Sequence, residues 1–165
     1  MPDDAPKLWV PGDPLPDDMK EFHFVSWIDG SIAVTSYAVA RDVDVLSEEG
    51  IDSIVSLGEL TPLETGGRHV ERIRKFYDKE GAADIRDEAI TRAVSVVLRL
   101  SSDGKVLVHC AAGVSRSPGV CMLSLCIRDG LGWDEAKRIV TDKRRIANVH
   151  PVLEARLTRW LAVNR

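Results

Sequence analysis

The chain has 165 residues, enough for one domain with a hydrophobic core, and its plentiful apolar residues and mixed charges are ordinary for a globular enzyme. Its formal net charge of −4 argues against a nucleic-acid-binding protein, which needs a basic surface to neutralise phosphates. No apolar run approaches the roughly 20 residues that span a bilayer, and no signal-peptide pattern is present, so we expect no membrane association. The chain has three cysteines, an odd number, which favours a cytoplasmic protein with reduced thiols.

Residues 1–20 differ in composition from the rest of the chain. They hold five of the eight prolines and five aspartates, and they offer little apolar surface for packing. This composition predicts an extended or disordered N-terminal arm. Residues 21–165 are predicted to form a single folded domain, and we expect the protein to be a monomer.

The remainder of the chain alternates between strand and helix patterns. Short apolar runs bounded by turn residues predict strands at 22–27, 31–35, 51–57, 70–77 and 105–109. Helical spacing of apolar residues predicts helices at 39–46, 84–100, 116–128, 134–143 and 151–162. Strands that alternate with helices indicate an α/β domain.

The junction between the strand at 105–109 and the helix that follows it carries the main candidate site. Residues 109–118 read HCAAGVSRSP, so five residues separate Cys110 from Arg116. Neither of the other cysteines has an arginine at this spacing. Because ligands of α/β folds bind beyond the carboxyl ends of the strands, this position suits a binding site.

Residues 110–116, which we name the Cys–Arg loop, suit the binding of a phosphate group. A short loop that enters a helix can direct successive backbone amides at one anion, and the helix N-terminus favours negative charge. Arg116 can bind two phosphoryl oxygens in bidentate fashion. The predicted phosphate-binding residues are Ala111, Ala112, Gly113, Val114, Ser115 and Arg116.

Cys110 is the predicted nucleophile. Amides and a helix dipole favour the thiolate form of a cysteine, and a thiolate beneath a phosphate is placed for in-line attack on phosphorus. Ser117 is expected to hydrogen-bond to the sulfur when it becomes the leaving group, although Ser117 can instead simply cap the helix. His109 is expected to order the loop rather than act as a base.

The leaving group needs a proton, which a carboxylic acid on a separate segment can supply. Asp78, at the end of the predicted strand 70–77 and 32 residues before Cys110, is the preferred candidate. Asp84 and Asp87 are rivals, but both have the pattern of helix-start residues.

The segment His109-Cys110-x5-Arg116-Ser117 is similar to the signature of the protein tyrosine phosphatase superfamily, and residues 112–118 resemble its dual-specificity branch. Further matching segments are WIDG at 27–30, GIDSIVSL at 50–57, FYD at 76–78 and WDEA at 133–136. The resemblance implies a central mixed sheet of four to five strands flanked by helices. It also implies hydrolysis of phosphate monoesters through a phosphocysteine, with no cofactor or metal. The family's nucleophile falls on Cys110, its arginine on Arg116, its hydroxyl on Ser117 and its acid on Asp78.

Two departures from the family pattern affect the predicted site. No Trp-Pro-Asp sequence is present, which favours a shallow and compact site. Where the family usually has an asparagine that braces the active-site loop, this chain carries His150.

We therefore expect a phosphatase that acts on phosphotyrosine, and on phosphoserine or phosphothreonine, in proteins or peptides. The first alternative is a phosphoinositide or other non-protein phosphomonoesterase, disfavoured because residues 111–115 contain no lysine. A sulfurtransferase or arsenate reductase, and a phosphate-binding scaffold without activity, are further alternatives.

Other residues receive simpler interpretations. Cys121 and Cys126 are expected in the core, with the additional hypothesis that Cys121 forms a disulfide with an oxidised Cys110. The basic runs at 72–75 and 143–145 are expected to be solvated, and 143–145 is a candidate contact for an acidic phosphopeptide.

Overall fold

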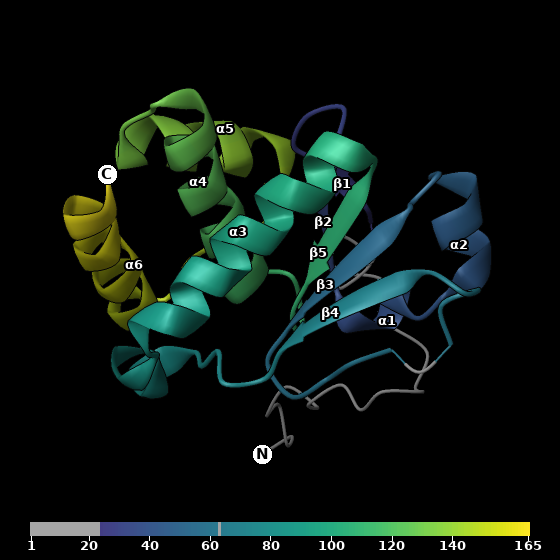
Figure 1. Ribbon diagram of the computed structural model, residues 1–165, viewed down its shortest axis with the longest axis horizontal. Helices are drawn as coiled ribbons and strands as arrows, with labels where there is room; N and C mark the ends of the chain where they lie inside the picture. Colours follow the sequence, from purple (N-terminus) through teal and green to yellow (C-terminus); the bar gives the residue numbers. More distant parts are fainter. Residues whose placement is uncertain (1–23, 63) are drawn as a thin grey trace, which may run out of the picture.

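The computed structural model describes residues 24–62 and 64–165, and a five-stranded mixed sheet forms its centre (Figure 1). The strands are β1 (Ser26–Trp27), β2 (Ile32–Thr35), β3 (Ser53–Leu57), β4 (His69–Ile73) and β5 (Val106–His109), in the order β1-β2-β5-β3-β4. Only the β1–β2 pairing is antiparallel among the strands of this sheet. The prediction of a mixed sheet flanked by helices is confirmed.

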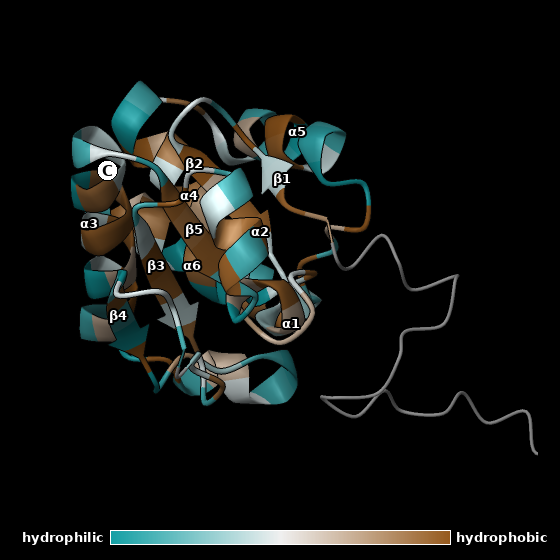
Figure 2. Ribbon diagram, turned by 90° about the vertical axis from the view of Figure 1, so that its right-hand side faces the viewer, coloured by the Kyte–Doolittle hydropathy of each residue, from teal (hydrophilic) through white to brown (hydrophobic). Residues whose placement is uncertain are grey.

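Helices cover both faces of the sheet. They are α1 (Tyr37–Ala40), α2 (Val43–Glu48), α3 (Asp87–Asp103), α4 (Arg116–Asp129), α5 (Trp133–Lys143) and α6 (Pro151–Asn164), with a 3-10 helix, η2, at Lys79–Asp84. Helices α3 to α6 gather on one side of the sheet, and α1 and α2 lie on the other (Figure 1). Figure 2 shows hydrophobic central strands, such as β5, and a more hydrophilic strand, β4, at the edge of the sheet.

The central strand β5 explains why the chain packs in three layers. Its residues alternate between two cores: Val108 packs in the large core with α3 and α4, whereas Leu107 packs in a small core with α1 and α2. Val108 lies opposite Val34 of β2 and Val55 of β3, which are also fully buried. An uninterrupted apolar run is typical of a strand that is covered on both faces.

Several predicted boundaries were wrong. The helix expected at 39–46 is two helices, because the side chain of Asp42 accepts hydrogen bonds from the amides of Asp44 and Val45 and starts α2. The strand expected at 70–77 ends at Ile73, beyond which the charged residues 74 and 75 are exposed. The helix expected at 84–100 begins at Asp87, because η2 occupies the preceding residues.

Only part of the predicted N-terminal region lies within the described residues. Of the strand expected at 22–27, residues 22 and 23 lie outside the described residues, and within the remainder only Ser26–Trp27 forms a strand. The arm predicted at residues 1–20 also lies outside the described residues. Within the described part of the chain, no helix combines the length and apolar character that crossing a membrane requires.

Candidate active site

The Cys–Arg loop begins where β5 ends and finishes where α4 begins. A pocket of about 270 Å3 opens over it. The pocket is lined by Asp78, Lys79, Cys110, Ala111, Ala112, Val114, Ser115, Arg116, Asn148, His150 and Pro151. Three separate parts of the sequence therefore meet here: the loop itself, the segment before η2, and the segment that enters α6.

Cys110 and Ser117 form the base of this site. The Cys110 Sγ lies 3.2 Å from the Ser117 Oγ, and both residues are almost completely buried. The alternative in which Ser117 caps the helix does not fit, because α4 has Ser115 at its N-cap position and no side-chain cap bond. The Ser117 hydroxyl is instead directed at the sulfur.

Arg116 is accommodated by a glycine from a distant part of the chain. Gly58, directly after β3, has a φ of 96°, and a Cβ at this position would lie 2.2 Å from Nη1 of Arg116. Any other side chain would therefore collide with the guanidinium group. The Nε of Arg116 is buried and has no hydrogen-bond partner within the described residues.

Arg144 holds the Cys–Arg loop from the side of α5. It is 2% exposed, and its Nε and Nη2 donate hydrogen bonds of 2.5 and 3.2 Å to the carbonyls of Gly113 and Ala112. Its Nη1 also donates to the carbonyl of Phe24 and the hydroxyl of Ser26. Burial lowers the pKa of Arg144 to about 10, so the side chain remains charged at neutral pH.

This burial corrects the interpretation of the run at 143–145. Lys143 and Arg145 are exposed as expected, but Arg144 is not solvated. Gly113 completes the contact, since its φ is 69° and a Cβ there would lie 2.6 Å from both the Arg144 Nη2 and the Thr35 carbonyl oxygen. The loop thus packs against buried groups on the side away from solvent.

His109 links β5 to β3 beneath the loop. Its Nδ1 donates to the carbonyl of Cys110 at 2.9 Å, and its Nε2 lies 2.6 Å from the hydroxyl of Ser56. Burial, aided by the nearby charge of Arg116 and opposed by the hydrogen bond to the Cys110 carbonyl, lowers the pKa of His109 to about 4. The ring is therefore neutral at neutral pH, with Nδ1 as donor and Nε2 as acceptor of the Ser56 hydrogen.

Asp78 lies at the same pocket, whereas its two rivals do not. The Ser115 Oγ donates a 2.8 Å hydrogen bond to Oδ1 of Asp78. Asp87 forms an ion pair with Arg156, and Asp84 is an exposed residue at the end of η2. Of the three carboxylates, only Asp78 lines the pocket.

The loop is braced through the main chain of the segment before α6. The amide of His150 donates to the Ser115 Oγ at 3.0 Å, and the amide of Asn148 donates to the carbonyl of Val114 at 2.7 Å. The His150 ring caps α6 by accepting a hydrogen bond from the amide of Val152. The missing asparagine side chain is therefore replaced here by two backbone amides.

The other two cysteines pack in the large core, as expected. Cys121 is fully buried and Cys126 is 1% exposed, and all three cysteines are free thiols. Burial raises the pKa of both Cys121 and Cys126. Residues 24–62 and 64–165 contain no group of three or more His, Cys, Asp or Glu side chains that could hold a metal ion.

Sequence reasoning missed four contributors to the site: Ser56, Gly58, Arg144 and Asn148. Gly58 carried a usable signal, because a glycine that directly follows a buried strand often marks a close approach of another group. Ser56 is a polar residue in an otherwise apolar strand, which also indicates a specific partner. Arg144 and Asn148 had no distinguishing pattern.

Comparison with known proteins gives a consistent result. The family model for the dual specificity phosphatase, catalytic domain, matches residues 32–162. Dual specificity protein phosphatase 15 of Rattus norvegicus is 44% identical over 48 residues, 29% of this chain and 20% of that protein. Dual specificity protein phosphatase 4 of Homo sapiens is 28% identical over 112 residues, 68% of this chain and 28% of that protein. The chain thus spans less than a third of the length of these curated relatives.

Solved structures share the fold at low sequence identity. The structure of DUSP15 has a TM-score of 0.75 at 20% identity, with 85% of this chain and 88% of that chain covered. The human tyrosine phosphatase-like serine/threonine/tyrosine-interacting protein has a TM-score of 0.74 at 19% identity, with 85% and 97% covered. At this identity the likeness concerns the arrangement of helices and strands.

Proposed function

Since this chain belongs to the family of dual specificity phosphatase catalytic domains, we propose that it is a protein phosphatase that hydrolyses phosphate monoesters through a phosphocysteine. The observation that carries the proposal is the convergence of Cys110, Arg116 and Asp78 on one pocket, with the Ser117 hydroxyl 3.2 Å from the sulfur. A nucleophile, an anion clamp and a proton donor are the groups that transfer of a phosphoryl group to sulfur requires.

The first step forms the phosphocysteine. The Cys110 thiolate attacks phosphorus, the bond from phosphorus to the ester oxygen breaks, and protonated Asp78 transfers its proton to that oxygen. Arg116 and the loop amides stabilise the charge on the equatorial oxygens. The Nε of Arg116, which is buried and has no hydrogen-bond partner in the described part of the chain, supports this role, because a bound phosphoryl oxygen would supply such a partner.

The second step releases phosphate. Water attacks phosphorus and gives its proton to the Asp78 carboxylate, while the bond between sulfur and phosphorus breaks. The Ser117 hydroxyl donates a hydrogen bond to the departing thiolate, which makes the sulfur a better leaving group. Asp78 is thereby protonated again and Cys110 is again a thiolate, so the cycle closes without a cofactor.

The shape of the pocket supports a broad range of phosphorylated residues. Its lining includes no Phe, Tyr or Trp side chain from the described part of the chain, and the loop contributes Ala111 and Ala112. Such a lining leaves room for the short side chains of phosphoserine and phosphothreonine as well as for phosphotyrosine. We propose phosphorylated proteins as substrates, with hydrolysis of phosphotyrosine and of phosphoserine or phosphothreonine.

Two other functions share parts of this geometry. A phosphoinositide phosphatase needs cations for additional phosphates, and the only lysine among the lining residues is Lys79. A binding protein without activity would use the same fold, which the human tyrosine phosphatase-like interacting protein also has. The presence of nucleophile, arginine and acid in one pocket favours the enzyme.

The proposal extends to the state of the protein in the cell. Three free thiols suit the reducing cytoplasm, where we place the protein as a monomer that binds neither nucleic acid nor membrane. Cell fractionation tests the location away from membranes, and light scattering of the purified chain tests the monomeric state. Recovery in a membrane fraction, or a stable dimer, would contradict them.

Turnover of p-nitrophenyl phosphate tests the catalytic proposal. Wild type is expected to hydrolyse it with inhibition by vanadate, and Cys110→Ser is expected to be inactive because serine is a poor nucleophile at neutral pH. Unchanged turnover in Cys110→Ser would refute the proposal. A panel of phosphopeptides and phosphoinositides then decides the substrate class, since preference for the lipids would favour the first alternative.

The assignment of the acid is tested separately. Asp78→Ala is expected to slow hydrolysis of phosphopeptides, which have poor leaving groups, by about 100-fold or more. Asp84→Ala and Asp87→Ala serve as matched controls and are expected to retain activity. Full activity of Asp78→Ala would assign the proton transfer to another group.

A further inference from the structure

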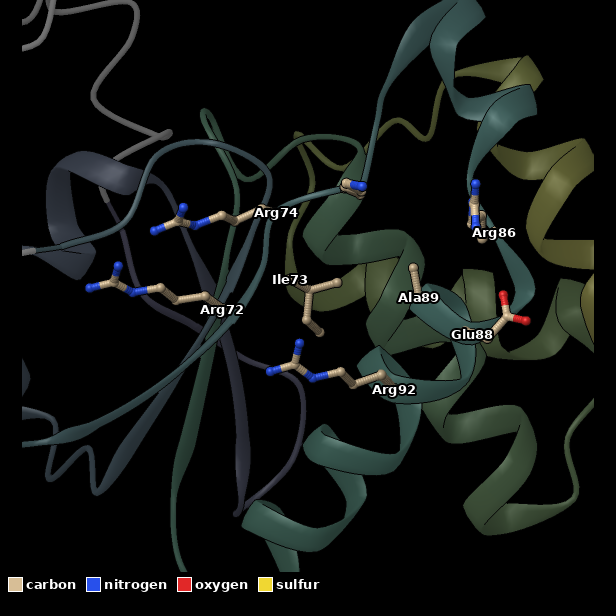
Figure 3. Close-up of a pocket in the computed structure, with 8 residues that line it drawn as sticks. Arg72, Ile73, Arg74, Arg86, Glu88, Ala89 and Arg92 are labelled. Carbon is tan, nitrogen blue, oxygen red and sulfur yellow. The ribbon is translucent and has the colours of Figure 1, made fainter.

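A second pocket, of about 510 Å3, lies between the end of β4 and the start of α3 (Figure 3). It shares no lining residue with the pocket at Cys110. Five cations and one anion surround two apolar residues; the lining residues are Arg72, Ile73, Arg74, Lys75, Arg86, Glu88, Ala89 and Arg92. We name this pocket the cationic groove.

The charge of the cationic groove is opposite to that of the whole chain. The formal charge of its lining residues is +4, from five cations and Glu88, whereas the chain as a whole carries −4. Figure 3 shows Arg72 and Arg74 extending from the end of β4 away from α3, whereas Arg92 of α3 reaches toward Ile73, so that the cations flank this edge of the sheet on both faces. A concave surface lined by one sign of charge attracts ligands of the opposite sign.

Most of these cations have no partner among the residues that the structure describes. Arg92 pairs with Glu71 at 3.2 Å. The side chains of Arg72, Arg74, Lys75 and Arg86 are exposed and make no hydrogen bond or ion pair within residues 24–62 and 64–165. They are therefore available to an external anion.

The groove also borders the free edge of the sheet. β4 is the last strand in the order β1-β2-β5-β3-β4, so its outer side has no neighbouring strand in the part of the chain that the structure describes. Extended peptides bind such edges through main-chain hydrogen bonds. Cationic side chains on an edge also prevent unwanted strand pairing, and an acidic segment is the kind of peptide that they would admit.

We propose that the cationic groove binds an extended, acidic segment of the phosphoprotein substrate. This inference rests on the proposed function and specifies the class of protein that the phosphatase recognises. The groove is close enough to the candidate active site for one substrate chain to reach both, because Lys75 and Asp78 are three residues apart and their Cα atoms lie at most ~11 Å apart. The strand edge favours a peptide over a membrane, which offers no main chain to pair.

Direct binding tests the groove without reference to catalysis. A fluorescently labelled, unphosphorylated peptide of alternating Glu and Gly is titrated with the full chain and followed by anisotropy. Arg74→Glu/Arg86→Glu is expected to weaken binding on the order of tenfold, and salt is expected to weaken binding to wild type. Both positions lie outside the strands and helices, and Arg74→Gln/Arg86→Gln, with a smaller expected loss, guards against a folding defect.

A matched variant separates the groove from the net charge. Lys143→Glu/Arg145→Glu makes the same change of charge at two exposed cations of the run 143–145, which is the rival contact for an acidic peptide, and is expected to bind the peptide like wild type. An equal loss in both variants, or a loss only in the 143/145 variant, would overturn the proposal. Unchanged binding in the groove variant would mean that these arginines only block the edge of the sheet. Binding of anionic vesicles in place of the peptide would also overturn it.

Kinetics connect the groove to the substrate. Two phosphotyrosine peptides, identical except for an acidic or a neutral flanking segment, are compared with p-nitrophenyl phosphate. The groove variant is expected to raise KM for the acidic peptide alone, with unchanged turnover of the other two substrates. If wild type hydrolyses none of the three, the proposed function fails, while the anisotropy measurement still decides whether the groove binds acidic peptides. Equal KM values for both peptides in wild type would refute the role in substrate recognition.

Discussion

The Ser115 hydroxyl donates a 2.8 Å hydrogen bond to Oδ1 of Asp78, which joins the Cys–Arg loop to a segment 37 residues earlier in the chain. The same hydroxyl accepts a bond from the His150 amide, so three segments meet at one oxygen atom. Oδ1 of Asp78 also accepts from the amide of Lys79. With Oδ1 occupied as an acceptor, Oδ2 is the oxygen available to carry the proton in the proposed mechanism.

Replacement of Ser115 by alanine tests whether this bond positions the acid. We expect Ser115→Ala to slow hydrolysis of phosphopeptides by roughly tenfold, because Asp78 loses the hydrogen bond that holds its carboxyl group at the pocket. Turnover of p-nitrophenyl phosphate, which has a better leaving group, is expected to change less. Ser124→Ala is the control, since Ser124 bonds only within α4. Equal losses on both substrates would show that Ser115 does not act through the acid.

Replacement of Gly58 tests the space reserved for Arg116. Gly58→Ala introduces a Cβ 2.2 Å from the guanidinium group and strains a backbone with φ of 96°. We expect vanadate affinity and turnover to fall by about tenfold or more, because the arginine is displaced from the phosphate. Gly30→Ala is the matched control, since nothing lies within 4 Å of its Cβ position. Unchanged vanadate affinity in Gly58→Ala would contradict this account of the clamp.

Replacement of Arg144 tests whether a buried cation supports the loop. Arg144→Leu leaves the carbonyls of Gly113, Ala112 and Phe24 without their donor, so we expect the free energy of unfolding to fall by about 2–5 kcal/mol. Arg145→Leu, at an exposed neighbour, is expected to change it by less than about 0.5 kcal/mol. Urea unfolding measures both. Equal effects of the two substitutions would contradict the role given to Arg144.

The neutral state of His109 predicts a dependence of stability on pH. Burial holds its pKa at about 4 in the folded protein, below the ordinary value of 6.5. The unfolded chain therefore binds a proton that the folded chain does not, and stability falls as pH decreases through the window from 6.5 toward 4. The difference in pKa adds about 3 kcal/mol to the free energy of unfolding above pH 6.5, and this contribution is lost as the pH falls to about 4.

Urea unfolding of wild type and His109→Asn, at about pH 7 and about pH 5, measures this contribution. Wild type is expected to lose more stability than the variant, because only wild type must keep a buried imidazole neutral. A parallel decrease in the two proteins would mean that other groups cause the pH dependence. His69→Asn, at an exposed histidine, is the control for general effects of removing an imidazole.

The sequence was sufficient for the parts of the site that are continuous along the chain. The strand, Cys110, the small residues and Arg116 follow one another, and the helix after them begins at Arg116 as predicted. Asp78 was identified by its distance along the chain and its type, and it lines the same pocket. Fold class followed from the same local patterns, because buried strands and amphipathic helices have different periods.

The sequence was insufficient wherever a contact joins distant segments. Arg144 stands in a run of three basic residues, and nothing local distinguishes the buried one from its exposed neighbours. The charged run at 72–75 was treated as a solvated face; its arrangement with Arg86 and Arg92 around one groove depends on how β4 packs beside α3. The end of β4 at Ile73 was missed for a similar reason, since strand propensity continues into a segment that the packing of Asp78 and η2 redirects.

The phosphocysteine is the central claim, and rapid-quench mass spectrometry of the enzyme with a phosphotyrosine peptide tests it most directly. We predict one phosphoryl group on the peptide fragment that contains Cys110, formed in the first turnover and absent from Cys110→Ser. A first turnover with no phosphorylated enzyme, or a phosphoryl group on a residue other than Cys110, would contradict the account.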